Sequence, residues 1–155
     1  MLNASGSSDP DGDALTFTWD VNGDSVFGDA TGVAPTRTWS DLVNLSIKDN
    51  GVFTVTVRVE DGKGRLDEAS TALTVNNVTP SASIDGPTEG LRGNTLAFTL
   101  GASDPSPADQ AAGFTYEIDW NSNGAVDQTT TGLTGLLVNH VFSEAGSFTV
   151  QVTAT

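Results

Sequence analysis

Two stretches of this sequence, Gly51-Val-Phe-Thr-Val-Thr-Val57 and Gly146-Ser-Phe-Thr-Val-Gln-Val152, are nearly identical and lie 95 residues apart. In both, apolar side chains alternate with polar ones. Successive side chains of a β-strand point to opposite faces of the sheet, so a period of two buries one face and leaves the other in water. Each stretch therefore predicts a half-buried β-strand.

Further matching segments show that the chain contains a repeat. Ser8-Asp9-Pro10 matches Ser103-Asp104-Pro105 at the same offset, and Trp19-Asp20-Val21-Asn22 resembles Ile118-Asp119-Trp120-Asn121. The matches follow one another in the same order along the chain. They predict two tandem copies of one domain.

A short polar segment, Asn76-Asn77-Val78-Thr79-Pro80, separates the two copies. Its proline has no backbone N–H and favours an extended conformation in the residue before it, so we expect a semi-rigid joint. The predicted domains are residues 1–76 and 77–155. Both lengths are ordinary for small domains.

Neither repeat holds a complete set of predicted strands. The second begins with strands at 82–84 and 95–100 before its Ser-Asp-Pro segment, whereas only residues 1–7 precede that segment in the first. The first repeat ends on a strand at Ser70–Val75, whereas the second stops at Thr155. We therefore expect the first repeat to lack its first strand and the second its last strand. The open sheet edges that result would invite a strand from another chain.

The other apolar runs are short and rich in threonine and valine, which favours an all-β fold. Further strands are predicted at Leu15–Asp20, Val52–Glu60, Phe114–Trp120, Leu136–Phe142 and Ser147–Thr155. The segment after Trp39 is different, because Ser40 is expected to cap one turn of helix, with Leu42 and Ile47 folding inward.

The charge balance excludes several classes of partner. The chain has 20 acidic and 6 basic residues, for a net charge of −14. Nucleic acids and anionic membrane surfaces attract the opposite charge, so neither is an expected partner. No segment approaches the roughly 20 apolar residues of a membrane span, and membrane insertion is not expected. The excess of aspartate supplies the oxygen ligands that calcium prefers.

The segments described above resemble the PKD-type repeat. They are Ser8–Asp13, Phe17–Asp20 and Asn50–Asp61 in the first copy and Tyr116–Trp120, Asn139–Phe142 and Ala145–Val150 in the second. The resemblance covers nearly the whole chain and implies two tandem immunoglobulin-like β-sandwiches. It also implies an extracellular or cell-surface location, since such repeats are found in large bacterial surface proteins and secreted hydrolases. There they act as spacers, adhesive units or accessories close to the substrate.

A calcium site is predicted where the strand from Phe114 ends. From Asp119 onward, oxygen-bearing side chains occupy alternate positions, as in the first part of an EF-hand loop, and Gly124 stands at the sharp turn. Thr130 replaces the acid that closes an EF-hand, so we expect a shortened loop with structural calcium. The predicted ligands are Asp119, Asn121, Asn123, Ala125 and Asp127 in the second repeat and Asp20, Asn22, Asp24 and Asp29 in the first.

The same pattern has a second interpretation that needs no metal. Aspartate and asparagine side chains in turns accept hydrogen bonds from nearby backbone N–H groups. The residues alone do not decide between the two interpretations. A further acidic loop, Asp9-Pro-Asp-Gly-Asp13, precedes the strand predicted at Leu15–Asp20 in the first repeat. This loop is expected to lie near Asp61.

No combination of residues indicates an enzyme. His140 is the only histidine, and neither a Ser-His-Asp set nor a nucleophile elbow is present. The expected function is a non-catalytic spacer or adhesive unit, with neighbouring repeats and cell-surface polysaccharide or protein as partners. The alternative is an accessory polysaccharide- or protein-binding module of a secreted hydrolase. That alternative would need exposed aromatic rings, for which Trp39, Tyr116 and Trp120 are the candidates, whereas Trp19 is expected in the core.

Overall fold

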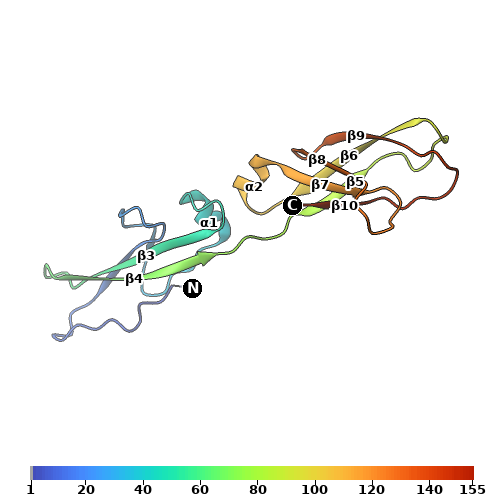
Figure 1. Cartoon of the computed structure of the whole chain (residues 1–155). Coiled ribbons are helices and arrows are strands. Elements are labelled where there is room, and N and C mark those ends of the chain that lie inside the picture. The colour runs from blue at the N-terminus through green and yellow to red at the C-terminus, as the bar shows by residue number, and fades with distance from the viewer. Residues whose placement is uncertain (1) are drawn as a thin grey trace. The chain divides into compact units, whose positions relative to one another are not determined.

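The computed structural model describes residues 2–155 and divides into two compact units, Met1–Asn76 and Asn77–Thr155. The division falls within the polar segment between the two repeats. All paired strands in both units are antiparallel, and they are drawn as arrows in Figure 1. The prediction of an all-β fold is confirmed.

Unit 1 is built on one four-stranded sheet with the order β2-β1-β3-β4. Its strands are β1 (Thr16–Asp20), β2 (Ala30–Thr31), β3 (Gly51–Glu60) and β4 (Leu66–Val75). β4 pairs with β3 over the full ten residues of β3, whereas β1 pairs with the second half of β3 alone. The opposite layer is irregular chain, in which Leu2 and Ala4 donate backbone hydrogen bonds to Pro35 and Val33.

The core of unit 1 forms on the inward face of β1 and β3. Trp19, Val55 and Val57 are buried there, as the alternating pattern predicts, and Ala4 packs against them from the opposite layer. The Trp19 indole N–H donates to the Gly32 carbonyl at 2.9 Å, so the one polar atom of this ring is satisfied.

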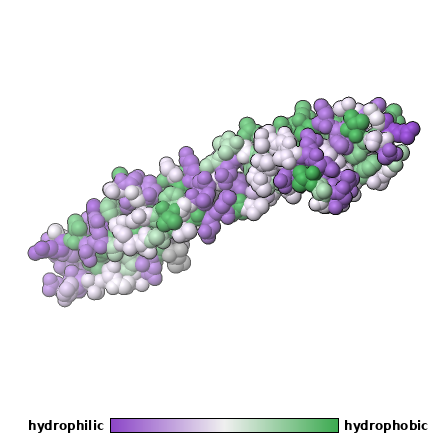
Figure 2. All heavy atoms as spheres, in the orientation of Figure 1, coloured by the Kyte–Doolittle hydropathy of each residue, from purple (hydrophilic) through white to green (hydrophobic). Residues whose placement is uncertain are grey.

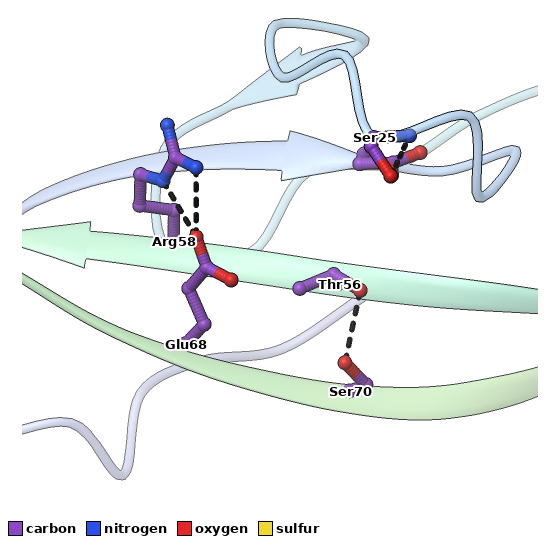
Figure 3. Close-up of polar contacts among 6 residues, drawn as sticks. Ser25, Thr56, Arg58, Glu68 and Ser70 are labelled. Atoms are coloured by element: carbon purple, nitrogen blue, oxygen red, sulfur yellow. Dashed lines mark hydrogen bonds and ion pairs between the residues drawn. The ribbon is translucent and has the colours of Figure 1, made fainter.

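Polar pairs between β3 and β4 cover the outward face of the same sheet (Figure 3). The hydroxyls of Thr56 and Ser70 are hydrogen-bonded at 2.9 Å, and Arg58 contacts the Glu68 carboxylate at 2.8 Å. The Arg58 guanidinium also lies over the Phe27 ring, 3.8 Å from its centroid. Arg58 therefore holds the loop that contains Phe27 against the sheet.

Helix α1 (Trp39–Asn44) forms where one helical turn was predicted, but its cap is different. Thr38, not Ser40, is the N-cap, and its hydroxyl accepts the backbone N–H of Asp41 at 3.2 Å. The Asp41 carboxylate accepts the backbone N–H of Thr38 in return, which completes a capping box. Ile47 is buried and Leu42 packs on the core, as predicted.

Unit 2 contains two three-stranded sheets, with the orders β10-β7-β8 and β5-β6-β9. The elements are β5 (Ser81–Asp85), β6 (Thr95–Ser103), α2 (Pro107–Ala112), β7 (Phe114–Asp119), β8 (Gln128–Gly132), β9 (Leu136–Val141) and β10 (Gln151–Ala154). Between the sheets lies a core that includes Phe98, Leu100, Phe114, Tyr116, Ile118 and Trp120. On the face of each unit drawn in Figure 2, apolar side chains form small groups among hydrophilic ones.

Several boundaries differ from the prediction. The strand predicted over Ser147–Thr155 is limited to β10, and the strand predicted from Ser70 starts earlier, at Leu66. The short elements β2, β8 and α2 were not predicted. These elements lack the alternation of apolar residues on which the strand predictions depend.

Candidate functional site

The loop between β7 and β8 is organised by the carboxylate of Asp119. One oxygen accepts the backbone N–H groups of Asn121 at 3.1 Å and Asn123 at 3.2 Å, and the other accepts that of Gly124 at 2.7 Å. The Asp119 side chain is buried beneath the loop, with a relative exposure of 8%. A single aspartate thus accepts hydrogen bonds from three backbone N–H groups of the loop.

The other predicted ligands of this loop also accept backbone hydrogen bonds. Asp127 accepts the N–H of Trp120 at 2.8 Å, so it closes the loop from the β8 side. Asn121 accepts the N–H of Asn123 at 3.1 Å, and Asn123 accepts that of Ala125 at 2.8 Å. The predicted ligands therefore lie together in one loop, where their side-chain oxygens accept hydrogen bonds from the backbone N–H groups of the loop.

These contacts change the acidity of Asp119. Burial raises the pKa of its carboxyl group, but the backbone hydrogen bonds from Gly124, Asn121, Asn123 and Ser122 together outweigh burial. The pKa of Asp119 is therefore lower than its ordinary value. The backbone N–H groups of the loop therefore stabilise the charged form of Asp119.

Unit 1 repeats the arrangement between β1 and β2. Asp20, which is 3% exposed, accepts the N–H groups of Gly23 at 2.7 Å and Ser25 at 2.8 Å, one on each oxygen. Asp29 accepts the N–H of Val21 at 2.7 Å, just as Asp127 accepts that of Trp120. We call this pair of aspartates, Asp20 with Asp29 or Asp119 with Asp127, the aspartate clasp.

Asn22 and Asp24 complete the loop of unit 1. Asp24 accepts the N–H of Val26 at 2.8 Å, and Asn22 accepts that of Asp24 at 3.2 Å. The amide nitrogen of Asn22 also donates to the carbonyl of Leu45 at 3.1 Å. Because Leu45 is the C-cap of α1, this contact joins the loop to the helix.

The backbone of both loops enters the left-handed region. Gly124 has a φ of 85°, in agreement with its predicted role at the sharp turn, and Gly23 has a φ of 78°. Ser25 and Ser122 also have positive φ values, of 68° and 59°. Sequence reasoning missed these serines because left-handed backbone is uncommon outside glycine and asparagine.

Asp9 and Asp61 of unit 1, which were expected to lie near each other, each accept hydrogen bonds from the backbone of their own turn. Asp9 accepts the N–H groups of Asp11 and Asp13, and Asp61 accepts those of Lys63 and Arg65. Over residues 2–155, no group of three or more histidine, cysteine, aspartate or glutamate side chains is placed to hold a metal ion.

An aromatic cluster lies beside the loop of unit 2. His140 stacks on Trp120, and Phe142 meets His140 edge to face with ring centroids 4.5 Å apart. Burial lowers the pKa of His140, whereas the nearby Asp127 acts in the opposite direction. The cluster borders an open hollow of about 560 Å³. Trp120 and Tyr116 are only 3% and 0% exposed, so neither belongs to an exposed aromatic row.

The fold and the loops together define two tandem modules of β-sandwich type. In each module, an aspartate clasp closes the loop between two strands. The family model described as "PKD domain" matches residues 1–75 and again residues 78–155. The chain therefore belongs to the PKD domain family, whose members are immunoglobulin-like modules of extracellular proteins and typically non-catalytic.

Among solved structures, this chain is similar to one described as "Structure of amphioxus IgVJ-C2 molecule". The two chains are 16% identical, the match covers 91% of this chain and 86% of that one, and the TM-score is 0.39. The search of curated proteins found no significant match.

Proposed function

We propose that this chain is a non-catalytic extracellular module, a spacer or adhesive unit within a larger surface protein. The observation that supports this most strongly is the double occurrence of the PKD domain, with only two residues between the matched segments. Repeats connected so closely add length to a protein without adding a new kind of site. The partners would be neighbouring repeats of the same chain and cell-surface polysaccharide or protein.

The packing of the one histidine supports a role without catalysis. His140 is half-buried, and its ring packs against those of Trp120 and Phe142. In the part of the chain that is described, residues 2–155, no helix combines the length and the apolar character needed to cross a membrane.

Calcium bound at the aspartate clasps is the second part of the proposal. The donors suit a hard cation, because carboxylate and amide oxygens are calcium ligands. Each of these oxygens already accepts a backbone hydrogen bond or lies beside one that does, so the ion would use remaining lone pairs. The residues that would hold it are Asp119, Asn121, Asn123, Ala125 and Asp127 in unit 2 and Asp20, Asn22, Asp24 and Asp29 in unit 1. The ion would offset the charge of the paired carboxylates.

Thermal unfolding with calcium and with a chelator tests this part. A ligand that binds the folded state alone adds about 2.7 kcal/mol at about 100-fold excess over its Kd, which corresponds to several degrees. Asp127→Asn is the matched variant, because asparagine can still accept the N–H of Trp120 but carries no charge. Calcium should raise the melting temperature of the wild type more than that of Asp127→Asn. Equal melting temperatures in calcium and chelator would rule out calcium stabilisation and leave the spacer function untouched.

The alternative, an accessory module of a secreted hydrolase, predicts binding to an isolated polysaccharide or protein. The burial of Trp120 and Tyr116 removes two of the three aromatic rings that such a surface was expected to use. A glycan array probed with the intact chain distinguishes the two functions. Selective retention of one polysaccharide class would favour the accessory module.

A further inference from the structure

The hollow beside the aromatic cluster of unit 2 combines aromatic rings with carboxylates. Its volume of about 560 Å³ is ordinary for a site that takes a small ligand. It lies where β8 begins and β9 ends, and these are the outer strands on the side of unit 2 opposite β10. The residues that line it include Trp120, His140 and Phe142 together with Asp127 and Glu144, but, among residues 2–155, no lysine or arginine. The hollow therefore offers aromatic surface and negative charge to a ligand.

Both carboxylates of the hollow can still accept hydrogen bonds. One oxygen of Asp127 accepts the backbone N–H of Trp120, whereas over residues 2–155 the other oxygen accepts none. Glu144 is exposed and forms no ion pair with another residue of the described chain. Carboxylates without a counter-charge, in a chain with a net charge of −14, attract cations. The ligand that suits the hollow is therefore positively charged.

Arg37 of unit 1 occupies the position that His140 occupies in unit 2. Each stands four residues after a residue that pairs with a buried core side chain. The two pairs are Val33 with Ala4 and Leu136 with Leu100. The local sequences also correspond, since Arg37-Thr-Trp and His140-Val-Phe both place an aromatic residue two positions later. The two repeats can therefore be compared at this position.

The guanidinium of Arg37 contacts the aspartate clasp of unit 1. It donates a hydrogen bond to the backbone carbonyl of Asp29, which is the counterpart of Asp127 in the clasp of unit 2. His140 carries a shorter side chain, and its ring stacks on Trp120 instead. Unit 2 thus keeps the clasp and has a hollow beside it, but it lacks the guanidinium that unit 1 supplies from its own chain.

We infer that the hollow of unit 2 binds an arginine side chain of a partner protein. The guanidinium would lie near the carboxylates of Asp127 and Glu144, and its flat face would stack on the aromatic wall. Arginine suits this site better than lysine, because its planar group stacks on rings and donates hydrogen bonds in several directions at once. The inference does not rest on the spacer function or on calcium, and the spacer function would stand if it failed.

Acetyl-arginine amide is the probe, added to the intact chain at neutral pH in a chelator. The indole N–H of Trp120, which donates to the side-chain oxygen of Gln128 at 3.2 Å, reports on the hollow by NMR. Its signal should shift and saturate with a Kd on the order of millimolar, because a single side chain makes few contacts. The indole N–H of Trp19, which is buried in unit 1, is the internal control and should not shift.

Two further probes separate the guanidinium from charge and from shape. Acetyl-citrulline amide has nearly the same shape without the charge, and acetyl-lysine amide has the charge without the planar group. Each should bind about tenfold more weakly than the arginine probe. Equal binding of the lysine probe would show that the net charge of −14 attracts any cation, and it would overturn the inference. Equal binding of the citrulline probe would overturn it as well.

Variants of the chain complete the test. His140→Arg should place a guanidinium beside Asp127, as Arg37 does beside Asp29, and should abolish binding of the probe. Because this change also removes the stack on Trp120, Glu144→Gln is a second variant, at an exposed residue. It should raise the Kd roughly two- to fivefold, as expected for one exposed ion pair.

Glu117→Gln is the matched control, because it removes the same charge from an exposed position of β7 that does not line the hollow. Its Kd should equal that of the wild type. The same Kd for Glu144→Gln and Glu117→Gln would overturn the inference. The absence of any shift of the Trp120 signal with the arginine probe would also overturn it.

Discussion

The imidazole ring of His140 lies parallel to the indole ring of Trp120, with ring centroids 4.2 Å apart and an angle of 13° between the planes. His140 belongs to β9 and Trp120 directly follows β7, so the stack joins the two sheets of unit 2. The ring of Phe98 also packs against this indole, with ring centroids 5.1 Å apart. The contact between the layers of unit 2 therefore includes an ionisable group.

Unit 2 should lose stability as the pH falls below the ordinary pKa of histidine. Burial lowers the pKa of His140 in the folded state, so the unfolded chain takes up the proton more readily. The contribution is complete above the unfolded value of 6.5 and is lost as the pH falls through the folded pKa. Urea unfolding between about pH 7.5 and about pH 5 should show this loss in the wild type. His140→Gln cannot take up the proton and should show a flatter profile, and parallel profiles would contradict the prediction.

Tyr116→Phe should stabilise unit 2 by about 1 kcal/mol, because the Tyr116 hydroxyl is buried without a hydrogen-bond partner in the structure. Burial also raises the pKa of Tyr116, so the folded state holds the proton more tightly. The associated stability is lost as the pH rises above the ordinary value of 10.0, and the variant should lack that loss. Denaturant unfolding at neutral and alkaline pH measures both effects. Tyr116→Ala, which leaves a cavity, should instead cost roughly 3–5 kcal/mol.

Thr38→Ala should destabilise unit 1 by about 1 kcal/mol through loss of the helix cap. The Thr38 hydroxyl accepts the N–H of Asp41 and also donates to its carboxylate at 2.9 Å. Ser40→Ala is the control, because Ser40 lies inside the helix and should change stability little. A larger loss for Ser40→Ala than for Thr38→Ala would show that the helix begins later than the structure indicates.

Asp119→Ala should lower the melting temperature of unit 2 by several degrees even in the presence of a chelator. The backbone N–H groups of Asn121 and Gly124 lose the Asp119 carboxylate as acceptor, and that of Asn123 keeps only the side chain of Asn121. In the wild type, hydrogen bonds hold the pKa of Asp119 low, so its contribution is present above the ordinary value of 3.8 and is lost as the pH falls through the folded pKa. NMR signals of unit 2 during heating measure the change. An effect confined to calcium-containing buffer would show that the metal, and not the backbone, is the main partner.

Long strands with strict alternation could be predicted from the sequence. Residues 52–60 were predicted as a strand, and β3 spans Gly51–Glu60. The shorter length of β10 was not predicted, because residues 147–150 share the alternation of β3 and yet are not part of a strand. Helix α2 carried a signal that was overlooked: Ser106 followed by Pro107 is a favourable helix start, and the Ser106 hydroxyl accepts the N–H of Asp109 at 3.1 Å.

The residues of the candidate site could be found from the sequence, but their role could not. Alternating oxygens from Asp119 to Asp127 suit either a cation or the amides of a tight turn, because both interactions use the same lone pairs. The structure supplies the amide contacts for both loops. Calcium binding to these loops depends also on the affinity of the loop for the ion, and the spacing of the residues does not determine that affinity.

The aspartate clasp has a consequence for how these repeats can diverge. The second carboxylate reaches back eight residues in unit 1, from Asp29 to Val21, and seven residues in unit 2, from Asp127 to Trp120. One residue has therefore been gained or lost between the ends of the loop while both hairpins kept their closing contacts. Because the strands are joined by side chains at the loop's two ends, the positions between can change in number and chemistry. A change of one residue in loop length is therefore compatible with the closing contact of the aspartate clasp.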